Sequence, residues 1–173
     1  QFNMPWGLTV DEVGDIYVAD WKNDRIQKFN ADGSYLRTIG IPGSSRGMLN
    51  RPSDVAVDKD GDIYVCDWGN NRVQMFTREG RYLKTFTGDA TLSKSQLRRL
   101  WTTNARRMRM REMADLELEE KFQRPRSVTV DDEGHMYVSD KGGFRVQIYK
   151  KEAYPLTQDQ IMPPFKSETL QNF

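Results

Sequence analysis

The composition of this 173-residue chain excludes several classes of protein. Hydrophobic residues make up 37% and charged residues 29%, the mean hydropathy is -0.77, and no stretch is long and apolar enough to cross a bilayer. The 26 Lys and Arg nearly cancel the 25 Asp and Glu, so overall charge gives no reason to expect a nucleic-acid or membrane-surface partner. A single cysteine, Cys66, excludes an internal disulfide and is interpreted as a small buried residue. These values predict a soluble globular protein and leave its compartment undetermined.

One pattern recurs three times along the chain, and repetition at a fixed spacing is typical of a repeat fold. Each copy opens with a proline and reaches Val-Asp six positions later, at residues 5–11, 52–58 and 125–131. After a turn glycine, an apolar run ends in aspartate, at residues 16–20, 63–67 and 136–140. An arginine stands five positions after each of these aspartates, and the resulting pairs are Asp20 with Arg25, Asp67 with Arg72, and Asp140 with Arg145.

Each copy consists of short β-rich runs separated by Gly, Asp and Asn, which indicates antiparallel strands joined by hairpins. Four strands are predicted in the first copy, at residues 7–10, 15–19, 25–29 and 35–39, and the last strand of the second copy at 82–86. The second strand is apolar on both faces, as expected of a sheet with neighbours on both sides. The first two copies are 47 residues apart (52 − 5), and the Gly-, Ser- and Pro-rich stretch 41–50 is predicted to be a loop.

Together these motifs resemble the NHL repeat: Pro-x-x-Val-x-Val-Asp, Gly-Asp-Ile-Tyr-Val-x-Asp, Asn-x-Arg-Ile/Val-Gln-x-Phe and Gly-x-Tyr-Leu. The resemblance covers most of residues 5–88 and 125–149. It implies an all-β fold of four-stranded antiparallel propeller blades, usually six to a domain, and it leaves function open, because similar proteins include peptide lyases, RNA-binding and ligase-associated domains and extracellular sensors. The predicted organisation is two blades in residues 1–88, an insertion in 89–122, a third blade in 123–153 that lacks a convincing outer strand, and an extended tail in 154–173.

Three blades are about half of a six-bladed ring, and alone they would expose broad faces and open edges. Two explanations remain open. The chain, which begins inside a repeat, is the C-terminal part of a longer propeller, or two chains associate about a two-fold axis and complete the ring. The second explanation, a homodimer, is the one we favour from the sequence.

The insertion between the second and third copies is predicted to be α-helical. The spacing grows there to 73 residues (125 − 52), which is 26 more than before (73 − 47). Residues 93–96 fit a capping box, and apolar residues that include Phe122 fall on one helical face. Basic residues precede acidic ones, an order that opposes the helix dipole and would suit antiparallel pairing with a second copy. The residues assigned to self-association are Leu97, Trp101, Arg106, Arg107, Met108, Glu117 and Glu120.

Two other interpretations of the insertion remain. It packs on its own propeller, or its arginines bind nucleic acid while Trp101 stacks on a base, an interpretation ranked last because the adjacent acidic block would repel phosphate.

Motifs for catalysis or metal binding are weak. His135 is the single histidine, which excludes a multi-histidine zinc site and with it the metal centre that resemblance to the lyases would imply. Residues 58–62 resemble a calcium loop, but the glycine is one position early for an EF-hand and the same turn recurs in every copy. We therefore predict no catalytic residue, metal or cofactor. The alternative is a lyase- or hydrolase-like enzyme whose active centre needs blades absent from this chain.

The repeated Asp and Arg residues are assigned a structural role, because they fall at the ends of adjacent strands, where the carboxylate accepts the guanidinium or turn amides. The loops between second and third strands and those between blades should emerge on one side, and loops on a rigid scaffold usually carry function. The predicted binding residues there are Trp21, Lys22, Arg46, Trp68, Asn70, Lys141 and Phe144. In the alternative interpretation, Trp21 and Trp68 fill the gap between blades. The sequence thus predicts a non-catalytic binding and assembly module with a protein or peptide partner.

Overall fold

A computed structural model of the protein describes residues 1–88 and 121–151. Residues 89–120 of the predicted helical insertion, with all the self-association residues from Leu97 to Glu120, lie outside the described residues, and so does the predicted tail at 154–173. In the described ranges, no helix is long and apolar enough to cross a membrane.

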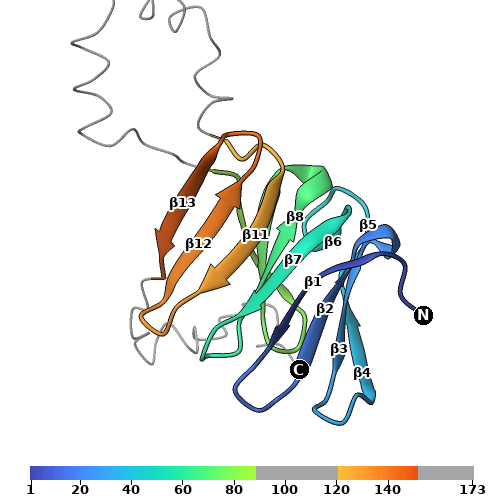
Figure 1. The fold of residues 1–173 in the computed structure, drawn as a ribbon. Coiled ribbons are helices and arrows are strands. Elements are labelled where there is room, and N and C mark those ends of the chain that lie inside the picture. The colour runs from blue at the N-terminus through green and yellow to red at the C-terminus, as the bar shows by residue number, and fades with distance from the viewer. Residues whose placement is uncertain (89–120, 152–173) are drawn as a thin grey trace, which may run out of the picture.

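Three antiparallel sheets stand side by side as blades, with their first strands β1, β7 and β11 adjacent (Figure 1). The first blade has the order β1 (Pro5–Val10), β2 (Ile16–Asp20), β3 (Arg25–Phe29), β4 (Tyr35–Ile39). The second consists of β7 (Pro52–Val57), β8 (Ile63–Asp67), β9 (Arg72–Phe76) and β10 (Tyr82–Phe86). The third consists, within the described residues, of β11 (Pro125–Val130), β12 (His135–Asp140) and β13 (Arg145–Lys150). The predicted all-β architecture of antiparallel blades is confirmed.

An aspartate closes the turn between the first two strands of each blade. In the second blade, Asp58 accepts hydrogen bonds from the backbone N–H groups of Asp60 at 3.0 Å and Asp62 at 2.9 Å, and from the Tyr64 hydroxyl at 3.0 Å. The left-handed conformation of Gly61 (φ 85°) completes the turn, which explains why a glycine recurs there. The stretch that resembles a calcium loop is therefore a tight turn whose first carboxylate is already engaged.

The connections differ from the sequence prediction in one detail. Short 3-10 turns, η1 (Trp21–Asn23) and η2 (Trp68–Asn70), join the second and third strands. The connection between the first two blades, predicted as a loop, contains a parallel pair of two-residue strands, β5 (Ile41–Pro42) and β6 (Met48–Leu49). It forms because the connection folds back on itself and brings its two ends within backbone hydrogen-bonding distance.

The hydrophobic core lies between the blades. In the first seam, Tyr17, Ala19, Ile26 and Ile39 of the first blade meet Leu49, Val55, Ile63, Val65 and Phe76. In the second seam, Ala56, Tyr64, Cys66 and Val73 meet Phe122, Val128, Met136 and Val138 of the third blade. All of β8 is buried, because the second blade is covered on both faces.

Phe122 corrects a sequence prediction. We expected it on the helical face of the insertion, but it lies in an irregular segment and packs in the second seam. Its backbone N–H donates to the Thr87 carbonyl oxygen at 2.8 Å. Phe122 occupies the register position of Leu49 (122 − 73), which fills the same place in the first seam. Its apolar character reflects blade packing rather than helix amphipathicity.

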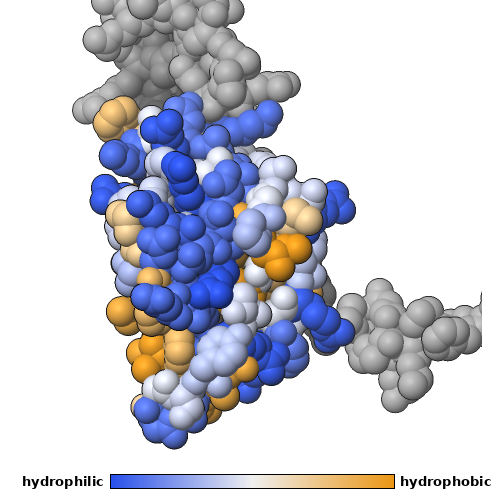
Figure 2. All heavy atoms as spheres, turned by 90° about the vertical axis from the view of Figure 1, so that its right-hand side faces the viewer, coloured by the Kyte–Doolittle hydropathy of each residue, from blue (hydrophilic) through white to orange (hydrophobic). Residues whose placement is uncertain are grey.

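The outer faces of the two end blades are apolar and exposed among the described residues. On the first blade, Leu8 is 67% exposed and Val10 is also exposed. On the third blade, Val146 and Ile148 are each 62% exposed. Figure 2 views the side of the first blade and shows hydrophobic patches between hydrophilic side chains. Sheet faces of this composition are normally covered.

Candidate functional site

A buried aspartate anchors the corner between the second and third strands of each blade. In the first blade, Oδ2 of Asp20 accepts hydrogen bonds from Arg25 Nε at 3.0 Å, Asn23 Nδ2 at 2.8 Å and Gln27 Nε2 at 2.8 Å. Its Oδ1 accepts from the backbone N–H of Asn3 at 2.7 Å. The carboxylate thus ties the corner to the chain segment that enters the blade, and all its bonds are internal.

The corner recurs in the other blades. Asp67 accepts from Arg72 Nε at 2.6 Å and from the Asn50 backbone N–H at 2.7 Å. Asp140 accepts from Arg145 Nε at 3.1 Å and from the Gln123 backbone N–H at 2.7 Å. The repeated pairs are therefore ion pairs inside each blade, and the structure does not bring the three carboxylates together as a catalytic array.

Burial affects two of these carboxylates differently. Burial acts to raise the pKa of Asp20, but the hydrogen bonds from Asn3, Asn23, Arg25 and Gln27 outweigh it and hold the pKa below its usual value. For Asp67 burial prevails and raises the pKa above its usual value. The difference follows from position, because the second blade is covered on both faces and the first on one.

Polar contacts fix the connection between the first two blades onto the same side as η1 and η2. Asn70 Nδ2 donates to the Gly43 carbonyl oxygen at 2.9 Å, and Arg72 donates to the carbonyl oxygens of Ser45 and Met48, both at 2.8 Å. We call this side the loop face. It comprises residues 20–25, 67–72 and 140–145, the inter-blade connections 40–51 and 121–124, and the adjoining starts of the first strands at 5–6, 52–53 and 125–126. Its backbone is held by side chains whose own positions are fixed in the blades.

Three tryptophan rings form a cluster on the loop face. The Trp6 and Trp21 rings meet edge to face with centroids 5.3 Å apart, and the Trp21 and Trp68 centroids are 6.0 Å apart. The Trp21 indole N–H is buried and has no hydrogen-bond acceptor among the described residues. Such an unsatisfied donor costs about 1–3 kcal/mol, so the Trp21 ring contributes through its aromatic contacts and not through its N–H.

An arginine lies over each of the three tryptophan rings. The Cζ atoms of Arg51, Arg124 and Arg126 lie 5.0, 5.1 and 5.2 Å from the ring centroids of Trp21, Trp68 and Trp6, in that order. These distances are within the range of cation–π attraction. Each arginine comes from a later blade than its tryptophan. We call the six residues the Trp–Arg array.

The backbone of two array arginines is fixed by the preceding blade. Arg51 and Arg124 adopt positive φ angles of 51° and 61°. The Arg51 N–H donates to Oδ1 of Asp24 at 2.6 Å, and the Arg124 N–H donates to Oδ1 of Asn71 at 2.9 Å. In the third blade the position of Asp24 and Asn71 is taken by Phe144, which has no acceptor and is 95% exposed. The Phe144 side chain therefore cannot accept the hydrogen bond that Asp24 and Asn71 accept between the described blades.

The structure divides the predicted binding residues into three groups. Trp21 and Trp68 belong to the array, whereas Asn70 bonds within its own corner and to the inter-blade connection. The remaining residues are exposed on the loop face outside the array: Lys22, Arg46, Lys141 and Phe144.

Sequence reasoning missed Trp6, Arg51, Arg124 and Arg126. One signal was present: Arg-Pro occurs in register at 51–52 and 124–125, where the first blade has Met4 before Pro5.

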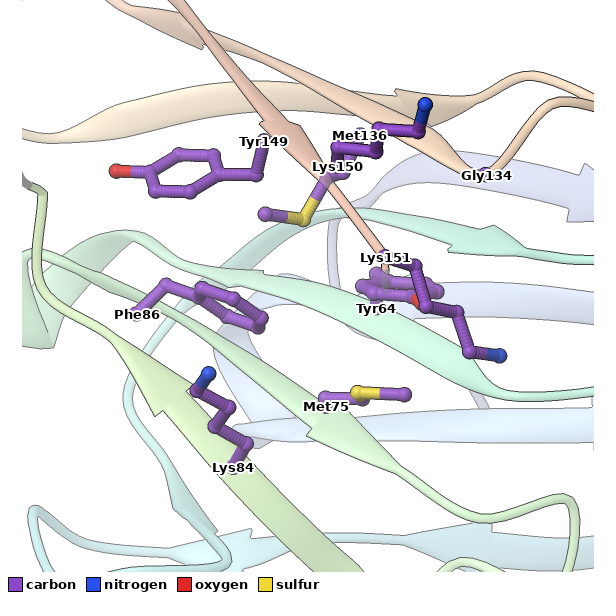
Figure 3. Close-up of a pocket in the computed structure, with 9 residues that line it drawn as sticks. All are labelled: Tyr64, Met75, Lys84, Phe86, Gly134, Met136, Tyr149, Lys150 and Lys151. Atoms are coloured by element: carbon purple, nitrogen blue, oxygen red, sulfur yellow. The ribbon is translucent and has the colours of Figure 1, made fainter. Parts of the chain in front are cut away.

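A cavity of about 260 Å³ lies in the second seam (Figure 3). The rings of Phe86 and Tyr149 lie together on one side of it, with their centroids 5.4 Å apart and their planes at 59°. The other lining residues are Tyr64, Met75, Met136 and Gly134, with Lys84, Lys150 and Lys151.

The turn between β9 and β10 closes the equivalent place in the first seam. There Gly80 packs against Ile39, and the Glu79 carbonyl oxygen accepts from Arg37 at 2.9 Å. The corresponding residues of the third blade follow Lys151, outside the described range. The cavity therefore lies where the described part of the third blade ends, and we assign no ligand to it.

No catalytic centre emerges from the described side chains. His135 begins β12 and its Nδ1 lies 3.1 Å from Oδ2 of Asp131 in a turn remote from the loop face. No group of three or more His, Cys, Asp or Glu among the described residues is placed to hold a metal ion. Burial raises the pKa of the Cys66 thiol well above its usual value, so this cysteine is not an activated nucleophile.

The packed antiparallel blades define the class: this is a β-propeller type of fold. Similar solved structures include a Bacteroides thetaiotaomicron protein of unknown function (TM-score 0.58, 18% identity, 84% of this chain and 34% of that chain). Hydrazine synthase of Kuenenia stuttgartiensis matches with TM-score 0.56 and 12% identity (84% and 32%). Virginiamycin B lyase of Staphylococcus aureus matches with TM-score 0.50 and 15% identity (87% and 42%). At these identities the likeness shows the fold alone, and this chain spans less than half of each of those chains.

The repeated sequence unit matches a known family. The NHL repeat matches residues 2–29, 49–76 and 122–149, so the chain carries three NHL repeats. Protein wech of Drosophila melanogaster is 53% identical over 34 residues, which are 20% of this chain and 4% of that protein.

Proposed function

We propose that this protein is a non-catalytic binding module that holds a protein or peptide partner on its loop face. One observation carries the proposal: the Trp–Arg array gathers three tryptophans and three arginines from three blades onto one surface. Tryptophan and arginine are the residue types that most often dominate binding energy at protein interfaces. The blades beneath them are rigid, so little conformational entropy is lost on binding.

Trp6 favours the interpretation as a binding surface over the one in which the tryptophans only fill the gap between blades. Trp21 and Trp68 are half-buried between blades, which also fits the alternative that they fill the gap there. Trp6 is 46% exposed, and the second blade has the small Ser53 at the same register position. A large aromatic side chain that the fold does not require, placed beside two others, supports a role in recognition.

Replacing Trp6 with serine should therefore abolish partner capture while leaving stability nearly unchanged. Because Ser53 occupies this position in the second blade, we expect the free energy of unfolding to fall by less than about 1 kcal/mol. Binding would be measured by capture of partners from extract of the source organism and by thermal unfolding of the same samples. Leu36→Ser, at an exposed position on the outermost strand of the first blade, is the matched control. Equal capture by Trp6→Ser and the control would refute the proposal.

Self-association is a second candidate function, supported by the outer face of the first blade. On that face Leu8 and Val10 occupy the positions that Val55 and Val57 occupy in the second blade, 47 residues later. In the second blade these apolar side chains pack in the first seam. Burial of such a face contributes about 25 cal/mol per Å² of apolar surface. The third blade of a second copy is a possible cover, although Phe144 would not supply the hydrogen bond that Asp24 and Asn71 provide between blades.

Light scattering tests the second candidate. We expect the mass of two chains for the purified protein and of one chain for Leu8→Glu, because a charge buried at the contact is strongly unfavourable. Leu36→Glu serves as the control for added charge at an exposed site of the same blade. A single-chain mass for the unmodified protein at all accessible concentrations would exclude ring completion by self-association.

A further inference from the structure

We propose that the Trp–Arg array recognises the carboxylates of an acidic peptide segment. The inference rests on the proposed function and names the class of partner: an extended stretch rich in Asp or Glu. Arginine guanidinium groups present paired N–H donors that match a carboxylate in a two-point, planar arrangement.

The array arginines are available for such a ligand. Arg25, Arg72 and Arg145 are each paired with a buried aspartate of their own blade. By contrast, Arg51, Arg124 and Arg126 form no ion pair with any carboxylate in the described part of the chain. All three are exposed. Two sets of arginines thus coexist: one holds the blades, and the other is exposed and has no ion-pair partner among residues 1–88 and 121–151.

The guanidinium groups of the array are also pre-oriented. The Arg51 and Arg124 guanidinium groups lie over the Trp21 and Trp68 rings, and this contact restricts the positions that they can take. The backbone of both residues is fixed by the hydrogen bonds from Arg51 to Asp24 and from Arg124 to Asn71. A side chain that is already ordered loses less entropy when it binds, which favours affinity for a matching anion.

The two ends of the blades differ in charge, and this difference would steer an acidic partner toward the loop face. The inter-blade connections 40–51 and 121–124 contain four basic residues and no acidic one: Arg46, Arg51, Lys121 and Arg124. The turns at the opposite end, residues 11–15, 58–62 and 131–135, contain three acidic residues each and a single lysine among them, Lys59. Complementary fields of this kind raise association rates and suppress binding in the wrong orientation.

The same geometry favours a peptide over single-stranded nucleic acid. Bases bind by stacking on free aromatic faces. On this surface Arg51, Arg124 and Arg126 already lie over the three tryptophan rings. These guanidinium groups compete with bases for the aromatic faces that stacking would use, and their own chemistry suits carboxylates.

The test uses an octapeptide of alternating Glu and Gly, labelled with fluorescein, and measures its binding to the full chain by fluorescence anisotropy. We expect Arg51→Gln with Arg124→Gln to weaken binding at least about tenfold, the loss of roughly one charge-assisted hydrogen-bond pair. Arg51→Lys with Arg124→Lys should weaken it about fivefold, because lysine keeps the charge but lacks the planar pair of donors. Arg78→Gln with Arg81→Gln, which removes the same charge from exposed positions in the turn between β9 and β10, away from the loop face, is the matched control and should cost less than about threefold.

Three results would overturn the inference. They are equal binding of a peptide with Gln in place of Glu, equal affinity for the Arg→Lys variant and the unmodified chain, and tighter binding of an eight-nucleotide oligothymidylate than of the acidic peptide. Failure of the proposed function would give a different result: Trp6→Ser and Leu36→Ser would then capture partners equally well. A partner that depends on Trp6 but is not displaced by the acidic peptide would leave the binding module standing and refute only the acidic class.

Discussion

Replacing Arg72 with alanine is expected to lower the free energy of unfolding by about 3–5 kcal/mol, because it leaves the carboxylate of Asp67 buried without its cation. Asp67 is fully buried, and burial already raises its pKa. The same guanidinium donates to the carbonyl oxygens of Ser45 and Met48, so the inter-blade connection would also lose two anchors. The corner of the second blade should therefore be the most sensitive of the repeated corners.

Arg25→Ala is the matched control for this expectation. The Arg25 side chain is 30% exposed, against 12% for Arg72, and it anchors only the Gln1 carbonyl oxygen besides Asp20. The Asp20 pKa lies below its usual value, so solvent and neutral donors stabilise this carboxylate more effectively. We expect a loss of about 1–2 kcal/mol for Arg25→Ala, measured for both variants by urea denaturation. Equal losses would show that covering the second blade on both faces has no energetic consequence at this corner.

Replacing Lys151 with methionine should be the second most damaging change that we predict, at roughly 1–3 kcal/mol near neutral pH. The Lys151 ammonium lies 2.8, 2.8 and 2.7 Å from carboxylate oxygens of Asp58, Asp60 and Asp62 and so joins the third blade to the second. Without it, three carboxylates of one turn would repel each other. Lys150→Met, a neighbouring exposed lysine, controls for loss of charge alone.

The effect of Lys151→Met should depend on pH in a defined direction. Hydrogen bonding to Lys151 holds the pKa of Asp60 below its usual 3.8, so this contribution is complete above that value and is lost as the pH falls below it. Burial acts to lower the Lys151 pKa, but the three carboxylates raise it above 10.5, so its contribution is lost only as the pH rises beyond that value. Urea denaturation should show the full difference near neutral pH and a shrinking one as the pH falls below 3.8. A difference that does not change with acidity would mean that Lys151 acts through packing and not through charge.

The two kinds of arginine have different surroundings, and only one of them contributes to the proposed binding surface. Arginines such as Arg72 form ion pairs with the buried aspartates of their own blades and stabilise each blade. The array combines residues that recur in register, Trp21 with Trp68 and Arg51 with Arg124, with departures from the repeat. At one position the first blade has Trp6, the second has Ser53 and the third has Arg126. We therefore expect substitution of an arginine that is paired with a buried aspartate to change stability, and substitution of an array residue to change binding.

The sequence by itself determined the repeated elements, because each depends on residues close together in the chain. The turn around Asp58 and Gly61 spans only a few residues, and the pairing of Asp67 with Arg72 spans five positions (72 − 67). Only the tertiary structure decided which loop residues meet. Trp6 lies 120 positions from Arg126 (126 − 6), and Arg51 lies 30 positions from Trp21 (51 − 21). These contacts exist because flat apolar faces pack blade on blade and set the inner strands side by side, a relation that local spacing does not encode.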